Sequence, residues 1–173
     1  DAGRMRLEGR EIRPASPQAA QALGISTVYQ EVNLCPNLSV AENIVAGRMP
    51  RRFGWIDWPA VQTLACQALE RLQLDIDPRR ILGEYPVAVQ QMVAIARAVS
   101  FDARVLVLDE PTSSLDEAET ARLFEVMRRL KERGVAILFV THFLDQAYAM
   151  ADRLTVMRNG RTVGEFRCDE LPR

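Results

Sequence analysis

Two adjacent carboxylates, Asp109 and Glu110, form the part of this sequence whose residue types are best suited to chemistry. They follow the apolar run VLVL at 105–108 and precede Pro111, which has no backbone N–H to donate. The run predicts a strand buried on both faces, as in a parallel sheet, that ends at the proline. Open α/β sheets bind ligands at the carboxyl ends of their strands. Because neighbouring carboxylates repel each other, the pair predicts a cation such as Mg²⁺, held together with a phosphate-bearing ligand.

The dipeptide alone would be more typical of a strand that ends in a solvated acidic turn. The complete stretch VLVLDEPTSSLD at 105–116 adds a proline, a serine pair and a Leu-Asp dipeptide after the carboxylates. A pattern of this length favours a nucleotide site over an acidic turn.

Two more polar residues stand at the ends of apolar runs that predict strands. Gln30 follows the run at 25–29, and His142 follows the run at 135–140. The carboxyl ends of parallel strands share one edge of a sheet, so these side chains and the two carboxylates are expected to face one ligand. A lone histidine at a strand end is more often structural. Its place beside the other strand ends favours a functional role for His142.

Each of these groups has a chemical role that suits its type. Asp109 can hold Mg²⁺ through a water, and Glu110 can orient or deprotonate an attacking water. Gln30 can bind the metal or the water without adding charge. His142 can donate a hydrogen bond to a terminal phosphate oxygen.

The elements that must position these residues are strands and helices with clear start and stop signals. Ser39 with Glu42, and Asp116 with Glu119, are capping boxes that predict helix starts. Apolar spacing predicts one helix at 58–72 and another at 86–100. Pro86 is expected in the first turn of the second helix. Tight turns are expected at the Glu-Gly pair 8–9 and the Asn-Gly pair 159–160, and a surface loop at 49–58.

The order of these elements predicts an α/β core that is interrupted by a block of helices. Strands separated by helices lie at both ends of the chain, and the helical block lies between them. The predicted division is 1–38 for the first part of the core, 39–100 for the helical part, and 101–173 for the rest of the core.

Bulk composition restricts the possible classes of protein. The chain has 173 residues, 48% of them hydrophobic, and a net charge of −1, which argues against disorder and against a strongly basic nucleic-acid surface. No apolar run is long enough to span a membrane, and no signal peptide is present. Cys35, Cys66 and Cys168 are far apart and form no CxxC pair, which suits a reducing cytoplasm.

These motifs, in this order, resemble those of the ATP-binding subunits of ABC transporters. VLVLDEPTSSLD is similar to their Walker B strand and D-loop, and FVTHFLDQAYAMADRLTVMRNGR to their switch-histidine region. GISTVYQEVNLCPNLSVAENI is similar to their Q-loop. The resemblance covers essentially the whole chain. It is strongest to the first half of the double ATPase subunits of monosaccharide importers, in particular those of the galactofuranose type.

The resemblance implies a P-loop NTPase core with a helical insertion, with ATP and Mg²⁺ as cofactors. Gln30 and Asp109 would be metal ligands, and Glu110 and His142 the catalytic carboxylate and the γ-phosphate switch. Ser114 and Asp116 would belong to the D-loop, at an interface with a second ATPase half. Further implied partners are membrane permease subunits and, indirectly, a periplasmic sugar-binding protein, with no nucleic acid. The implied location is peripheral, on the cytoplasmic face of the inner membrane.

The sequence departs from the family pattern in two places. No GxxxxGK[ST] phosphate loop is present, and we therefore expect that an amino-terminal part is missing and that this chain alone binds ATP weakly or not at all and is inactive. The family signature LSGGQ aligns with Tyr85–Val89, which lacks its serine, glycines and glutamine. In this family each signature closes over nucleotide held by the opposite half, so the altered segment predicts an ATPase with one competent site.

Two other functions remain open from the sequence. A soluble ABC-type ATPase acting on DNA or ribosomes would be expected to carry a long coiled coil or a basic linker, and neither is present. A non-catalytic interaction module would fit the missing phosphate loop, but the intact carboxylate pair argues against a decayed enzyme. Co-purification with permease subunits, and an ATPase assay of the chain extended at its amino end, would separate these possibilities.

Overall fold

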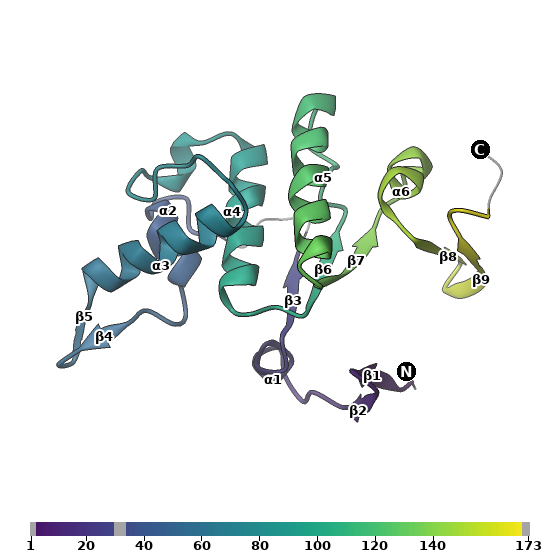
Figure 1. Cartoon of the computed structure of the whole chain (residues 1–173), viewed down its shortest axis with the longest axis horizontal. Coiled ribbons are helices and arrows are strands. Elements are labelled where there is room, and N and C mark those ends of the chain that lie inside the picture. Colours follow the sequence, from purple (N-terminus) through teal and green to yellow (C-terminus); the bar gives the residue numbers. More distant parts are fainter. Residues whose placement is uncertain (1–2, 30–33, 171–173) are drawn as a thin grey trace.

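A parallel sheet with the strand order β3-β6-β7 lies at the centre of the molecule (Figure 1). The computed structural model describes residues 3–29 and 34–170. The strands are β3 (Ile25–Val28), β6 (Val105–Asp109) and β7 (Ala136–Val140). Their register is level: Val28 pairs with Leu108, and Leu108 pairs with Phe139. The predicted parallel sheet is therefore confirmed, and its strands end together.

One face of this sheet is well covered and the other is not. Leu106 and Leu108 of β6 are fully buried on the covered face, where Phe124 of α5 (Glu117–Glu132) meets Phe139 edge-to-face at 6.1 Å. On the opposite face, Val105 and Val107 are half-buried, and Leu138 of β7 is 57% exposed. The expectation that β6 is buried on both faces is therefore wrong for the face that carries Val105 and Val107. Within the described residues, the helices α4 and α5 cover only the face that carries Leu106 and Leu108.

The helical block consists of α2 (Val40–Val45), α3 (Trp58–Arg71) and α4 (Val87–Ser100), which pack beside the sheet (Figure 1). A short 3-10 helix, η1 (Leu82–Glu84), precedes α4. The Ser39–Glu42 capping box is confirmed at the start of α2. Pro86 is the N-cap of α4 and not a residue of its first turn, because its ψ of 157° is extended. A continuous core of buried side chains runs from this block into the sheet and α5. The division into three parts stays a prediction.

The segment expected to be a surface loop at 49–58 does lie at the surface, but residues 51–56 in it form a short hairpin instead of an irregular loop. Strands β4 (Arg51–Arg52) and β5 (Trp55–Ile56) pair antiparallel across a two-residue turn. The turn has Phe53 at φ 52° and Gly54 at φ 87°. Left-handed φ at both positions gives the twist that a tight hairpin requires, although phenylalanine is an unusual residue for the first of them.

The remaining elements are two antiparallel hairpins and two short helices. Strands β1 (Met5–Leu7) and β2 (Arg10–Ile12) form one hairpin, and β8 (Arg153–Arg158) and β9 (Arg161–Arg167) form the other. Both turns occur where the sequence predicts them, with left-handed φ throughout. Helix α1 (Pro17–Ala22) precedes β3, and α6 (Leu144–Met150) follows β7.

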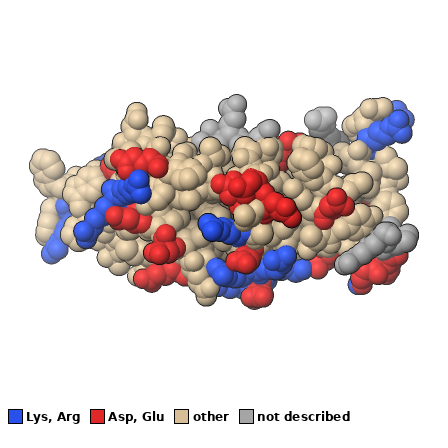
Figure 2. Space-filling model, turned by 90° about the horizontal axis from the view of Figure 1, so that it is seen from above, with Lys and Arg blue, Asp and Glu red and all other residues tan. Residues whose placement is uncertain are grey.

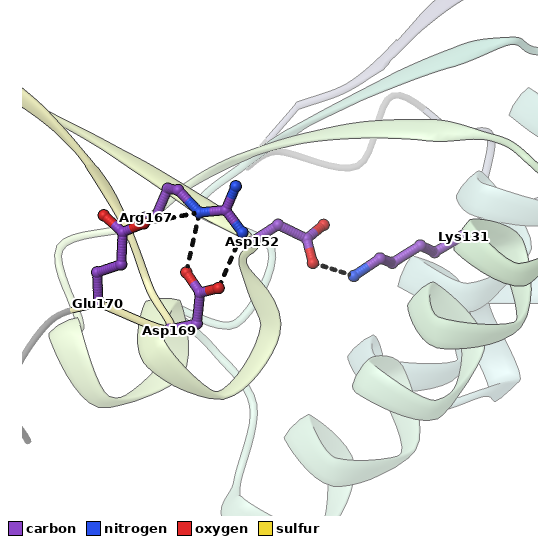
Figure 3. Close-up of polar contacts among 5 residues, drawn as sticks. All are labelled: Lys131, Asp152, Arg167, Asp169 and Glu170. Carbon is purple, nitrogen blue, oxygen red and sulfur yellow. Dashed lines mark hydrogen bonds and ion pairs between the residues drawn. The ribbon is translucent and has the colours of Figure 1, made fainter.

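Ion pairs connect the β8–β9 hairpin to its surroundings (Figure 3). Lys131 of α5 pairs at 2.6 Å with Asp152, just before β8. At the end of β9, the guanidinium of Arg167 contacts Asp169 at 2.8 Å. This hydrogen bond lowers the pKa of Asp169 and raises that of Arg167. All of these groups are exposed, so each pair contributes little to stability.

The surface carries both signs of charge. On the face seen in Figure 2, acidic and basic side chains are interspersed, with no basic tract of the kind that binds nucleic acid. Among residues 3–29 and 34–170, no helix has the length and apolar character that crossing a membrane requires.

Candidate functional site

The carboxyl end of β6 turns sharply between the two carboxylates. Asp109 is the last residue of the strand and pairs with Val140 of β7. The N–H of Glu110 still donates to the carbonyl of Val140 at 2.9 Å, but Glu110 itself has a φ of 44°. This left-handed conformation is uncommon for a residue with a long side chain and indicates that the surrounding structure holds it there. The two carboxylates are therefore carried by different backbone conformations.

Glu110 and His142 lie in direct contact. Nδ1 of His142 is 3.1 Å from Oε1 of Glu110, although the two residues are far apart in the sequence. The side chain of His142 is 60% exposed and that of Glu110 is 32% exposed, so the pair is open to solvent and to a ligand. The ring of Phe143 lies 4.0 Å from the ring of His142, centroid to centroid. The structure thus brings together the residues predicted to be catalytic.

The segment after Glu110 is fixed by contacts that the sequence did not reveal. The buried hydroxyl of Thr112 contacts Oε1 of Gln146 in α6 at 2.6 Å. The N–H of Ser113 donates to the carbonyl of Glu110 at 3.2 Å. Threonine after Glu-Pro gives no signal of this contact, because Gln146 lies in a different element. These contacts hold the turn that carries Glu110 against the helix that follows His142.

The structure describes two of the other predicted site residues, Asp116 and Ser114, but not the third, Gln30. Asp116 caps α5: its carboxylate accepts the N–H of Glu119 at 2.8 Å, as the capping box predicts. Ser114 is exposed and lies in the turn at 111–114, between Glu110 and α5. Gln30 lies outside the described residues. The D-loop roles of Ser114 and Asp116, and the metal role of Gln30, stay predictions.

The carboxylates present suit a magnesium ion that is bound mainly through a nucleotide. Within the described part of the chain, no group of three or more His, Cys, Asp or Glu side chains forms a metal cluster. Mg²⁺ usually takes only one or two protein carboxylates, and phosphates and water supply its other ligands. Asp109, half-buried at the strand end beside Glu110, fits that requirement.

The altered signature segment leads into α4, and several contacts hold its first residue, Tyr85, in place. The hydroxyl of Tyr85 accepts the N–H of Asp77 at 3.2 Å, and the guanidinium of Arg80 lies 4.8 Å from the centre of its ring. Gln90 donates its side-chain N–H to the carbonyl of Tyr85 at 2.9 Å. Pro86 caps the helix without any side-chain hydrogen bond. The N–H groups of Val89 and Gln90 donate to the carbonyl of Pro86, so those of Val87 and Ala88 are the ones in the first turn that could face an anion.

Asn43 is a further residue that sequence reasoning missed. It is 1% exposed in α2, and its side chain reaches back over the loop that precedes this helix. Oδ1 accepts the N–H of Cys35 at 2.7 Å, and Nδ2 donates to the carbonyls of Cys35 and Ser39, each at 2.9 Å. An asparagine inside a predicted helix was the available signal, because that residue type favours caps and loops.

A cavity lies between α1, β3 and α4, beside the sheet edge that β3 leaves unpaired. Its volume is about 420 Å³, and Tyr29, Leu34, Ala98 and Phe101 are among its lining residues. Ser26 also lines it; this side chain is 6% exposed, and its hydroxyl has no hydrogen-bond partner among the described residues. The cavity therefore joins the helical block to the strand that leads to Gln30.

Comparison with known proteins agrees with this geometry. The family model described as ABC transporter matches residues 1–113. The chain belongs to the ABC transporter family. An ATP-binding cassette of an ABC transporter, solved in its ADP conformation, superimposes with a TM-score of 0.81 at 26% identity. That match covers 96% of this chain and 70% of the other. The predicted fold class, a P-loop ATPase core of this family, is confirmed.

Two curated relatives are named as ATP-binding proteins of sugar transport. This ABC transporter chain is 50% identical over 172 residues to a galactofuranose transporter ATP-binding protein of Escherichia coli K12. It is 47% identical over 169 residues to a ribose import ATP-binding protein of Rubrobacter xylanophilus. The matches cover 99% and 98% of this chain but 34% of each relative, so the chain spans about a third of their length. The predicted resemblance to sugar-importer subunits is confirmed.

Proposed function

We propose that this chain is part of the ATP-hydrolysing subunit of an importer for a monosaccharide. The observation that carries the proposal is the contact between Glu110 and His142 at the carboxyl ends of two neighbouring parallel strands. The similarity to a galactofuranose transporter ATP-binding protein supports a sugar as the cargo.

The proposed chemistry assigns a separate task to each group. Asp109 would hold Mg²⁺ through water, with Gln30 as a second oxygen donor, and the metal would neutralise charge on the phosphates of ATP. Glu110 accepts a proton from the attacking water. His142 exchanges its contact with Glu110 for a hydrogen bond to the terminal phosphate, which frees Glu110 to face the water. Ser114 and Asp116 would contribute to the interface with the second ATPase half.

The partners follow from the same proposal. The cavity between α1, β3 and α4 would receive a segment of a membrane permease subunit, because it lies between the helical block and the strand that leads to Gln30. The subunit would then be peripheral on the cytoplasmic face of the inner membrane, and a periplasmic sugar-binding protein would deliver the sugar to the permease. No nucleic acid takes part.

The altered signature suggests that the two ATP sites of the intact subunit are unequal. Tyr85–Val89 would close over nucleotide held by the second half and would serve it poorly, because the side-chain donors of LSGGQ are absent. The site that contains Glu110 and His142 would then carry most of the turnover.

Substitution in the intact subunit, assayed with its permease in membranes, tests this proposal. Glu110→Gln should lower ATP turnover by roughly 100-fold or more, because the general base is lost. Glu132→Gln, at the exposed end of α5, is a matched control and should leave turnover unchanged. Replacing residues 85–89 by LSGGQ should change turnover little. Normal turnover in Glu110→Gln contradicts the assigned site, and a large gain from the restored signature contradicts the inequality.

A further inference from the structure

The hairpin of β4 and β5 and the start of α3 expose large aromatic side chains. Phe53 is 90% exposed, Trp55 is 81% exposed, and Trp58, the first residue of α3, is 49% exposed. Both tryptophans of the chain lie in this segment. Figure 1 shows the hairpin at the end of the molecule opposite the β8–β9 hairpin. The segment therefore projects apolar rings into solvent, away from the ATP-binding residues.

The turn itself does not account for Phe53. In the described part of the chain the same two-residue turn occurs at three places, where the first residues are Glu8, Phe53 and Asn159, with φ of 49°, 52° and 50°. A glycine follows in each case. Asparagine is among the favoured residues at this position, whereas a bulky aromatic residue is strained there. Neither turn formation nor packing explains a phenylalanine at this tip, where the residue is 90% exposed.

Basic side chains accompany the rings. Arg51 and Arg52 are both exposed, and the guanidinium of Arg52 lies 5.5 Å from the centre of the Phe53 ring. Asp57 is the one acidic residue in the segment 48–58, and its carboxylate is used to cap α3, where it accepts the N–H of Ala60 at 3.1 Å. The tip is therefore aromatic and positively charged.

We propose that this hairpin docks on an anionic lipid surface, with its rings at the level of the headgroups and its arginines on lipid phosphates. Tryptophan favours the boundary between water and lipid, and each nearby arginine adds attraction to anionic lipid. A stable protein interface usually needs about 20–30 residues from each side. A narrow hairpin tip supplies far fewer, whereas a lipid surface needs no matching shape. This docking proposal rests on the proposed function only in that an importer subunit works beside a membrane.

Native tryptophan fluorescence of the 173-residue chain measures the docking directly. The chain is titrated with vesicles of phosphatidylcholine and phosphatidylglycerol, and with vesicles of phosphatidylcholine alone. We expect a blue shift with the anionic vesicles that weakens as salt is added. The double substitution Arg51→Gln with Arg52→Gln should weaken partitioning roughly 30-fold. Arg158→Gln with Arg161→Gln, at the β8–β9 turn, is the matched control and should have no such effect.

Phe53→Asn separates docking from a structural role. It should weaken partitioning roughly tenfold and at the same time raise the midpoint of thermal unfolding, because asparagine suits the turn. Partitioning that is unchanged by Phe53→Asn, or lowered equally by the control arginines, overturns the proposal. If Phe53→Asn loses binding to the permease in detergent but binds vesicles as before, the hairpin contacts a protein partner, and the proposal of lipid docking is also overturned. None of these readouts depends on ATP turnover, so the two proposals fail separately.

Discussion

Replacing Asn43 by alanine should destabilise the chain by far more than a typical polar substitution. The side chain makes hydrogen bonds of 2.7 Å, 2.9 Å and 2.9 Å to Cys35 and Ser39. Each contributes roughly 1 kcal/mol net. The carbonyl of Ser39 keeps its bond to the N–H of Asn43, and water reaches the exposed Cys35, so the full sum is an upper limit. We expect a loss of about 2–3 kcal/mol in the free energy of unfolding.

Urea unfolding followed by circular dichroism measures this change, and the midpoint should fall by about 1 M. Asn37→Ala, on an exposed residue of the same loop, is the control and should stay within roughly 0.5 kcal/mol of wild type. Asn43→Asp should be at least as damaging as alanine although its shape is the same, because a carboxylate oxygen would face the carbonyls of Cys35 and Ser39. Equal midpoints for Asn43→Ala and Asn37→Ala would refute the assignment of Asn43 as a structural clamp.

Two further predictions concern Glu110 and Asp169. In urea unfolding, Glu110→Gly should be more stable than Glu110→Ala by about 1 kcal/mol. Both variants lose the contact with His142, but only glycine adopts the left-handed φ without strain. Equal stabilities of the two variants would argue against backbone strain at this position. The hydrogen bond from Arg167 lowers the pKa of Asp169, so its contribution to stability is present above the ordinary aspartate pKa and lost as pH falls through the lowered value. Arg167→Gln should move the NMR titration of Asp169 back towards the ordinary range.

Local signals in the sequence predicted much of the architecture. Ser39 and Asp116 begin their helices as the capping boxes require, and the Asn-Gly pair at 159–160 makes its turn. These signals work because each depends on residues a few positions apart. The parallel sheet and its common edge also follow from apolar runs separated by helices.

The errors and omissions involve contacts between distant residues or unfavourable local choices. The hairpin at β4 and β5 was missed because Phe53 takes a conformation that its residue type disfavours. The contact between Thr112 and Gln146 and the clamp made by Asn43 depend on which side chains meet in the fold. The open face of β7 was not foreseen either, because an apolar run does not reveal how much of each face is covered.

The conformation of Glu110 explains how two adjacent carboxylates can serve different purposes. In a continuing strand, successive side chains point to opposite faces of the sheet, so Glu110 would join Leu106 and Leu108 on the covered face. The left-handed φ ends this alternation and leaves Glu110 beside His142, beyond the sheet edge. Asp109 keeps its place in the strand register. The proposed roles of Asp109 in holding the metal and of Glu110 in activating water would thus be divided by a change of backbone conformation between neighbouring residues.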